Sequence, residues 1–117
     1  MELDKRVAEY AAAIAKDVDI LLEDAANLND QQRQIVDALK HSSVRFLSLY
    51  NEAMLSFAEG TVELGMVAFH LRLPLSSIHA YCDLLSSGEL GAWNQSQAQL
   101  LQQIKTVILS LTPLLYG

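Results

Sequence analysis

The sequence has one cysteine, two prolines and little charge, since only 19% of its 117 residues are Asp, Glu, Lys or Arg. The single cysteine, Cys82, excludes a disulfide bond within the chain and favours a reducing compartment such as the cytoplasm. Residues 1–5 lack the basic and then apolar character of a secretory signal, so we expect none. No run of 18 apolar residues occurs, because His70, Arg72 and Pro74 interrupt the most apolar segment, and we expect no membrane span.

Basic residues are also scarce. Eight Lys and Arg against 14 Asp and Glu give a net charge of −6, and the basic residues are scattered rather than clustered. This distribution does not fit a protein that binds a phosphate backbone, so we expect no nucleic-acid partner. Hydrophobic residues, in contrast, make up 51% of the sequence, which is above the usual range. The length predicts a single domain, 1–117. The composition predicts more apolar surface than the core of such a domain needs.

Helix-forming residues follow one another in four segments. We expect helices over Leu3–Ala26, Asp30–Ala58 and Val62–Ser86, and a fourth that opens at Trp93-Asn94. The pattern predicts an all-α, up-down four-helix bundle made of two hairpins, residues 1–59 and 60–117. Apolar residues recur in each segment at steps of three and four. The expected core positions are Val7, Ala11, Ile14, Val18, Leu21 and Ala25; Ile35, Leu39, Ser42, Phe46, Tyr50 (with Leu49), Ala53 and Phe57; Leu64, Ala68, Leu71, Leu75, Ile78, Cys82 and Leu85; and Leu100, Ile104, Val107 (with Ile108), Leu111 and Leu114 (with Leu115).

Two asparagines have the spacing of helix caps. Asn29 is followed three residues later by Gln32, and Asn94 by Gln97. This is the spacing of a capping box, in which the cap side chain and the later glutamine satisfy each other's backbone N–H groups. We therefore assign structural roles to Asn29 and Asn94.

Helix-breaking residues mark two further places. Gly60 is expected to end the second helix, and Thr61 to cap the third. Pro74 falls inside the third segment, where a proline removes one backbone hydrogen bond and costs about 3 kcal/mol. We therefore expect a compensating interaction around Pro74.

The two halves of the chain are similar to each other. Leu21-Leu22 matches Leu84-Leu85 at an offset of 63, and Asn29–Gln32 matches Asn94–Gln97 at an offset of 65. Duplication of one hairpin explains this similarity. The heptads and caps that any two hairpins of a bundle share explain it equally well.

The segment Phe69–Leu75 reads Phe-His-Leu-Arg-Leu-Pro-Leu, and it continues to Leu85 as Ser-Ser-Ile-His-Ala-Tyr-Cys-Asp-Leu-Leu. It resembles the phosphoacceptor helix of sensor histidine kinases, whose motif is His-Glu-Leu-Arg-Thr-Pro-Leu. The resemblance covers Met66 to Leu115 and is faint over the first half. It implies the dimerisation and histidine-phosphotransfer hairpin of bacterial two-component signalling.

The resemblance also implies that the family's chemistry is missing. When Pro74 is set on the family's proline, the phosphoacceptor histidine falls on Phe69 and its acidic neighbour on His70. Nothing in the sequence resembles the family's ATP-binding domain or a Gly-rich phosphate loop, so we expect no kinase activity from this chain and no cofactor. His41, His70 and His79 do not have metal-ligand spacing with Cys82, so we expect no metal site.

A second apolar stripe lies on the third predicted helix, roughly opposite the core stripe. Its members are Val62, Met66, Phe69 and Leu73, at positions where the resembled family is polar. A helix that is apolar on two sides is expected to be covered on both. The cover is either the Ala-rich first helix, a second copy or another protein.

Three hypotheses for function follow. The first is a non-catalytic interaction module that contacts a response regulator or a histidine kinase, or that self-associates, through Val62, Met66, Phe69, His70, Arg72 and Leu73. Arg72 would pair with acidic residues of the partner or lie along its own helix. The second is a phosphotransfer protein that uses His70, although one residue of displacement turns a side chain by about 100°. The third is a structural homodimeric bundle or a fragment of a larger sensor kinase.

Overall fold

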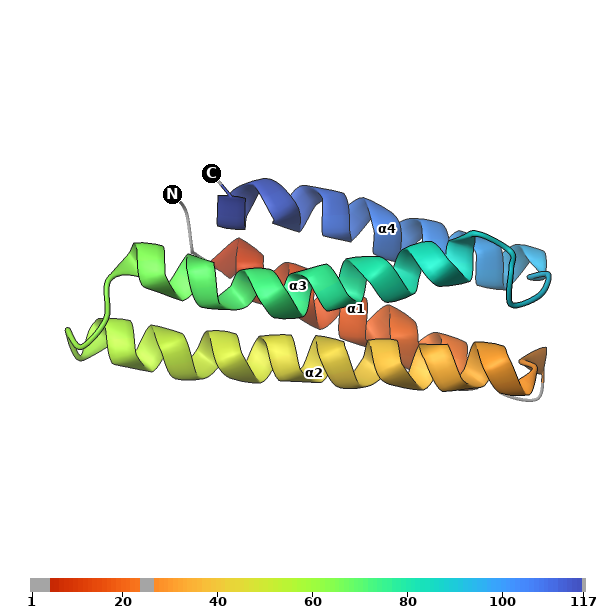
Figure 1. Cartoon of the computed structure of the whole chain (residues 1–117), viewed down its shortest axis with the longest axis horizontal. Coiled ribbons are helices and arrows are strands. Elements are labelled where there is room, and N and C mark those ends of the chain that lie inside the picture. Colours follow the sequence, from red (N-terminus) through yellow and green to blue (C-terminus); the bar gives the residue numbers. More distant parts are fainter. Residues whose placement is uncertain (1–4, 24–26, 117) are drawn as a thin grey trace.

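Four helices make up the fold in the computed structural model, which describes residues 5–23 and 27–116. They are α1 (Lys5–Glu23), α2 (Asp30–Ala58), α3 (Leu64–Ser86) and α4 (Gln95–Tyr116). The molecule is an elongated rod of 47 × 21 × 19 Å. The beginning of α1 and the end of α4 lie at the same end of the rod as the α2–α3 loop (Figure 1).

The helices form an up-down four-helix bundle, as predicted. Each of α1 and α3 packs chiefly against α2 and α4, so α1 and α3 lie diagonally across the bundle. Consecutive helices are antiparallel and joined by short loops (Figure 1). The hairpins α1–α2 and α3–α4 thus bury their apolar stripes against each other.

The core confirms most of the predicted stripes, with single positions of α2 and α4 shifted by one residue and Val67 of α3 added. Ala25 lies outside the described residues, and Leu64 is only half-buried. On α2, Val36 and Ser43 are buried in place of Ile35 and Ser42. The side chains that are buried on α2 and α4 are Gln32, Val36, Leu39, Ser43, Phe46 and Tyr50, and Gln97, Leu101, Ile104, Ile108, Leu111 and Leu115.

The capping glutamines give the physical reason for this shift. Gln32 and Gln97 are buried, and counting from each at steps of four and three reaches every buried position of its helix. On α4 the predicted Leu100 is half-buried and Leu101 is buried instead, while of the paired candidates Ile108 and Leu115 are buried and Val107 and Leu114 are half-buried. The core does not extend to the last two predicted positions of α2, since Ala53 is half-buried and Phe57 is 40% exposed.

Both predicted capping boxes form, and the first also fastens the α3–α4 loop. Asn29 accepts from the Gln32 N–H at 2.7 Å, and its own N–H donates to Gln32 Oε1 at 3.0 Å. The same two side chains donate to the carbonyls of Leu90 at 2.7 Å and Ala92 at 3.1 Å. The start of α2 is thereby tied to the loop that precedes α4. The box at Asn94 has the same internal geometry.

The α2–α3 loop corrects one prediction. Gly60 follows the C-cap of α2 with φ +79°, as expected of a glycine that ends a helix. Thr61 does not cap the third helix, because its hydroxyl donates to the Ser56 carbonyl at 2.9 Å and so closes the end of α2. The third helix begins at Leu64, after an extended Glu63 whose side chain makes no cap hydrogen bond.

The helix α3 runs through Pro74 without a break. Pro74 has no N–H to give to the His70 carbonyl, so one helical hydrogen bond is missing. Leu71, Leu75 and Ile78 on either side are at most 2% exposed, and burial of such side chains stabilises by roughly 1.5–3 kcal/mol each. Packing of the buried face therefore outweighs the cost of the proline.

The two hairpins share one buried pattern. Adding 64 to Val7 and Leu21 gives Leu71 and Leu85, and the three buried positions between them also coincide. Adding 65 to every buried position of α2 gives the buried positions of α4. Leu21 thus corresponds to Leu85, one residue later than the match in the sequence indicated.

Replacing Gly91 with alanine should destabilise the protein. Gly91 has φ +132°, and an added Cβ would lie 2.6 Å from Asn29 Nδ2 and 3.1 Å from Gln32 Nε2. We expect the free energy of unfolding to fall by about 1–3 kcal/mol, measured by urea denaturation. The matched control is Gly65→Ala, which adds a methyl group into open space in α3 and should be neutral or slightly stabilising. Equal effects of both changes would contradict this account of the loop.

Candidate functional site: the exposed face of α3

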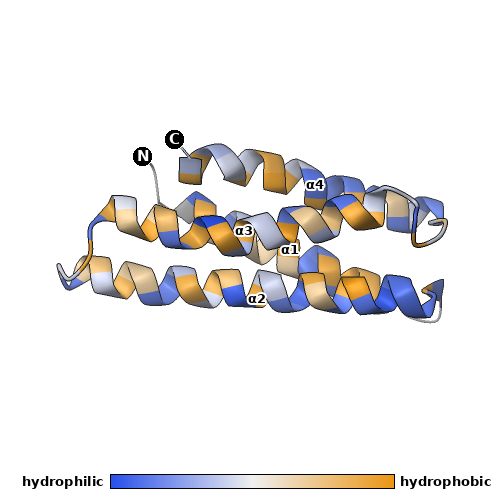
Figure 2. Cartoon of the chain, viewed as in Figure 1, coloured by the Kyte–Doolittle hydropathy of each residue, from blue (hydrophilic) through white to orange (hydrophobic). Residues whose placement is uncertain are grey.

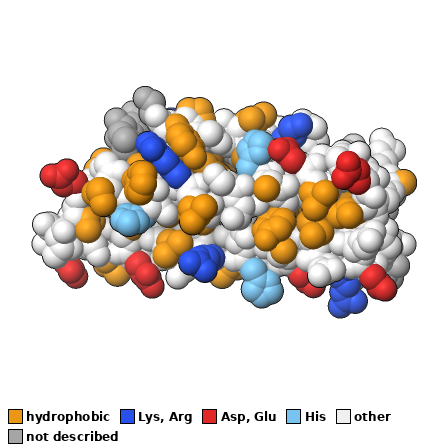
Figure 3. Space-filling model, viewed as in Figure 1, with side chains coloured by type: hydrophobic (Ala, Val, Ile, Leu, Met, Phe, Trp, Pro, Cys, Tyr) orange, Lys and Arg blue, Asp and Glu red, His pale blue; other side chains and the backbone are white. Residues whose placement is uncertain are grey.

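An apolar face of α3 points away from the core. Met66, Phe69 and Leu73 are 47%, 61% and 77% exposed, and Val62 just before the helix is half-buried. Coloured by hydropathy, α3 is apolar along much of its length, whereas the start of α2 is hydrophilic (Figure 2). Hydrophobic side chains spread over the face that α3 and α2 present in Figure 3. We call Val62, Met66, Phe69 and Leu73 the outer face of α3.

The first helix does not cover this face, so one of the three covers expected from the sequence is wrong. The reason is the bundle topology, which places α1 diagonally across from α3. The fold also does not require apolar residues on the outer face. In α1 the residue equivalent to Leu73 is Glu9, and both are exposed. A charged residue is therefore compatible with this position in the same kind of hairpin.

Arg72 contacts the end of α4 in the same chain. Its Nε donates to the Leu115 carbonyl at 3.2 Å, and its guanidinium lies 4.6 Å from the centre of the Tyr116 ring. The carbonyls of the last helical turn lack partners within the helix, so Arg72 caps the end of α4. It also lies 5.8 Å from the centre of the Phe69 ring. Arg72 therefore reaches across to α4, whereas the sequence predicted that it would pair with a partner or lie along its own helix.

His70 is exposed and stands beside the outer face. Its ring meets the Phe69 ring edge-on, with the ring centres 6.0 Å apart. Within residues 5–23 and 27–116, no hydrogen bond holds this imidazole. The imidazole is thus accessible to a partner.

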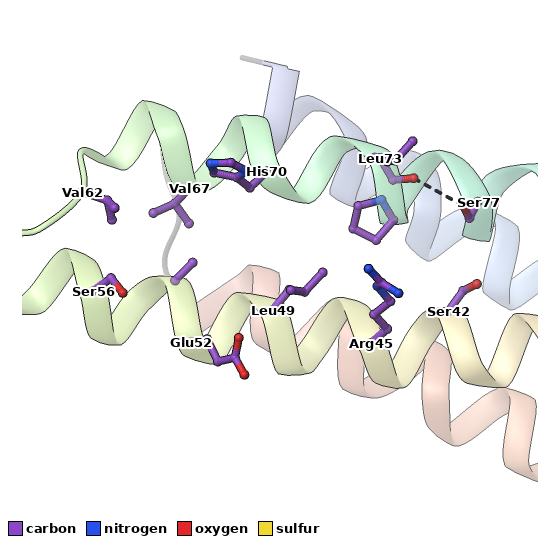
Figure 4. Close-up of a pocket in the computed structure, with 12 residues that line it drawn as sticks. Ser42, Arg45, Leu49, Glu52, Ser56, Val62, Val67, His70, Leu73 and Ser77 are labelled. Atoms are coloured by element: carbon purple, nitrogen blue, oxygen red, sulfur yellow. Dashed lines mark hydrogen bonds between the residues drawn. The ribbon is translucent and has the colours of Figure 1, made fainter.

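A groove of about 740 Å³ runs between α2 and α3 next to the outer face. Apolar and polar residues of both helices line it (Figure 4). Arg45 extends from α2 toward α3, and Glu52 lies further along α2 (Figure 4). The groove is lined by Ser42, Arg45, Leu49, Glu52, Ala53, Ser56, Val62, Val67, His70, Leu73, Pro74 and Ser77. Apart from His70, which the sequence singled out, its polar residues were not predicted as a site. Most of them belong to α2, and the sequence does not show which side of α2 faces α3.

The remaining candidate groups are engaged elsewhere. Cys82 is 1% exposed, as predicted for a small buried residue, and burial raises the pKa of its thiol. His79 Nδ1 lies 3.0 Å from Asp83 Oδ2, and His41 Nδ1 donates to the Asp37 carbonyl at 2.8 Å. In the described parts of the chain, no three His, Cys, Asp or Glu side chains come together as a metal site would need.

Comparisons of the chain with protein-family models, curated proteins and solved structures found no match. The resemblance to the kinase hairpin therefore rests on the residues between Met66 and Leu115. Among the helices described here, none is both long and apolar enough to cross a membrane.

Replacing Phe69 with aspartate should leave stability nearly unchanged. Because the ring is 61% exposed, we expect the free energy of unfolding to change by no more than about 0.5 kcal/mol. Leu71→Ala, two residues away in the core, should cost about 2–5 kcal/mol. Urea denaturation at low protein concentration, where self-association is minimal, compares the two. A loss for Phe69→Asp as large as for Leu71→Ala would show that Phe69 is buried.

Proposed function

We propose that this chain is a non-catalytic helical-bundle module of two-component signalling that acts by protein–protein contact. The outer face of α3 is its contact surface, and a response regulator or the hairpin of a histidine kinase is its partner. The observation that carries the proposal is the exposure of Phe69 and Leu73 at 61% and 77%. In the resembled family these two positions hold the phosphoacceptor histidine and a threonine.

The exposure of several apolar side chains on one helix supports a binding role. Isolated exposed apolar residues are normal on protein surfaces, but Met66, Phe69 and Leu73 follow one another on successive turns. Adjoining apolar side chains of this kind mark interaction surfaces. Glu9 at the position equivalent to Leu73 shows that the bundle itself does not need an apolar residue there.

The residue at the family's reactive position supports a non-catalytic role. A phenyl ring has no nucleophilic atom, so Phe69 cannot accept a phosphoryl group. A module that keeps the family's hairpin without its histidine would compete for, or hold, a partner of the active kinase. We place it in the cytoplasm, where two-component partners meet. The single thiol, Cys82, is buried and suits that compartment.

Binding to two-component proteins tests the proposal. Titration calorimetry against receiver domains and kinase hairpins from the same organism should find a partner for the wild type. Leu73→Asp should weaken that binding by about tenfold or more, because it puts a charge into the contact surface. Ile20→Asp changes an exposed apolar residue of α1 and serves as the control. No binding to any such protein, or equal loss in both variants, would refute the proposal.

A second candidate is phosphotransfer through His70, and the exposed imidazole favours it. If His70 is phosphorylated, incubation with phosphorylated receivers will leave an acid-labile, base-stable label on the chain. His70→Ala should abolish this label, whereas His79→Ala should keep it. Absence of label with every receiver would exclude this function.

A further inference from the structure

Two opposite charges on α2 have no partner among residues 5–23 and 27–116. Arg45 and Glu52 both line the groove between α2 and α3, and both are exposed. Neither side chain forms an ion pair or a hydrogen bond with any described residue. They are seven residues apart, roughly 10 Å along a helix, which is too far for them to pair with each other.

This arrangement is complementary to itself. If two copies of α2 lie antiparallel across a two-fold axis beside Leu49, midway between Ser48 and Leu49, Arg45 of each copy faces Glu52 of the other. Two ion pairs then form at once, because the same patch serves on both sides of such an interface. Leu49 of the groove lining, half-buried in the single chain, lies at the centre of this contact.

The same axis brings the outer faces of α3 together. Along the groove, Leu49 lies between His70 and Leu73 (Figure 4). An axis beside Leu49 therefore sets Leu73 of one copy against the turn that carries Phe69 and His70 in the other. Leu73 and Phe69, which are 77% and 61% exposed in the single chain, are covered by this arrangement.

Charge repulsion does not oppose this contact. From Leu64 to Cys82, α3 contains one residue with a fixed charge, Arg72, although the chain as a whole carries −6. Arg72 is turned toward Leu115 and Tyr116 of α4. Two copies that meet along α2 and α3 thus bring together few like charges.

We propose that a second copy of this chain docks on the α2–α3 groove, with α2 antiparallel to α2 and Arg45 paired with Glu52 in both directions. The proposal rests on the proposed function, in that it uses the outer face of α3 as a protein contact and names a second copy as its occupant. Both bundles stay closed, so the dimer forms between complete four-helix bundles.

Sedimentation equilibrium of the full chain and its charge-reversed variants tests the register. The wild type should dimerise, and Arg45→Glu or Glu52→Arg alone should raise the dissociation constant by about tenfold or more, because each sets like charges opposite one another. The double variant Arg45→Glu/Glu52→Arg should dimerise like the wild type. A mixture of the two single variants should form a heterodimer. Arg33→Glu, an exposed residue on α2 outside the groove, is the matched control and should dimerise normally.

Three results would overturn the proposal: a monomeric wild type, a double variant that does not recover, and an equal loss in Arg33→Glu. Its failure is distinct from failure of the proposed function. A monomeric wild type that binds a receiver or kinase hairpin through Leu73 overturns the dimer and leaves the function standing. If the chain dimerises and the charge-reversed variants behave as expected, but the chain binds no two-component protein, the proposed dimer is supported and the signalling role is refuted.

Discussion

Burial of one stripe of side chains fixes the rotation of α3 about its own axis. Leu71, Leu75 and Ile78 are at most 2% exposed, and turning the helix would expose them at a cost that exceeds the hydrogen bond lost at Pro74. With the rotation fixed, the residues half a turn away must face outward. The exposure of Phe69 and Leu73 is therefore a consequence of core packing.

Much of the fold follows from local sequence signals, and the errors have physical causes. The stripes of α1 and α3 and both capping boxes could be predicted, because periodicity and capping depend on residues close in sequence. Single positions of the α2 and α4 stripes, such as Ile35 and Leu100, are wrong by one residue, because Gln32 and Gln97 are buried although glutamine is usually exposed. The position of α1 relative to α3 is set by packing between helices. The sequence therefore identified the outer face but could not tell that α1 leaves it open, nor that Arg45 and Glu52 line the adjoining groove.

The two hairpins provide an internal comparison. Their buried positions coincide at offsets of 64 and 65 residues, so the requirements of the core act on both in the same way. Their outer faces differ, with Glu9 on α1 where α3 has Leu73. Since both helices fold into the same bundle, stability alone does not explain the apolar residues of α3. The difference points to a contact that involves the outer face of α3 and not the equivalent face of α1.

The two proposed contacts use overlapping surfaces, and this overlap has a consequence for regulation. Leu73 belongs both to the outer face and to the groove between α2 and α3. A second copy seated there covers the residues that a signalling partner would contact, so self-association and partner binding exclude each other. By linkage, each event then weakens the other by the same factor. A partner of sufficient affinity would dissociate the dimer, and a rise in the concentration of this chain would release the partner.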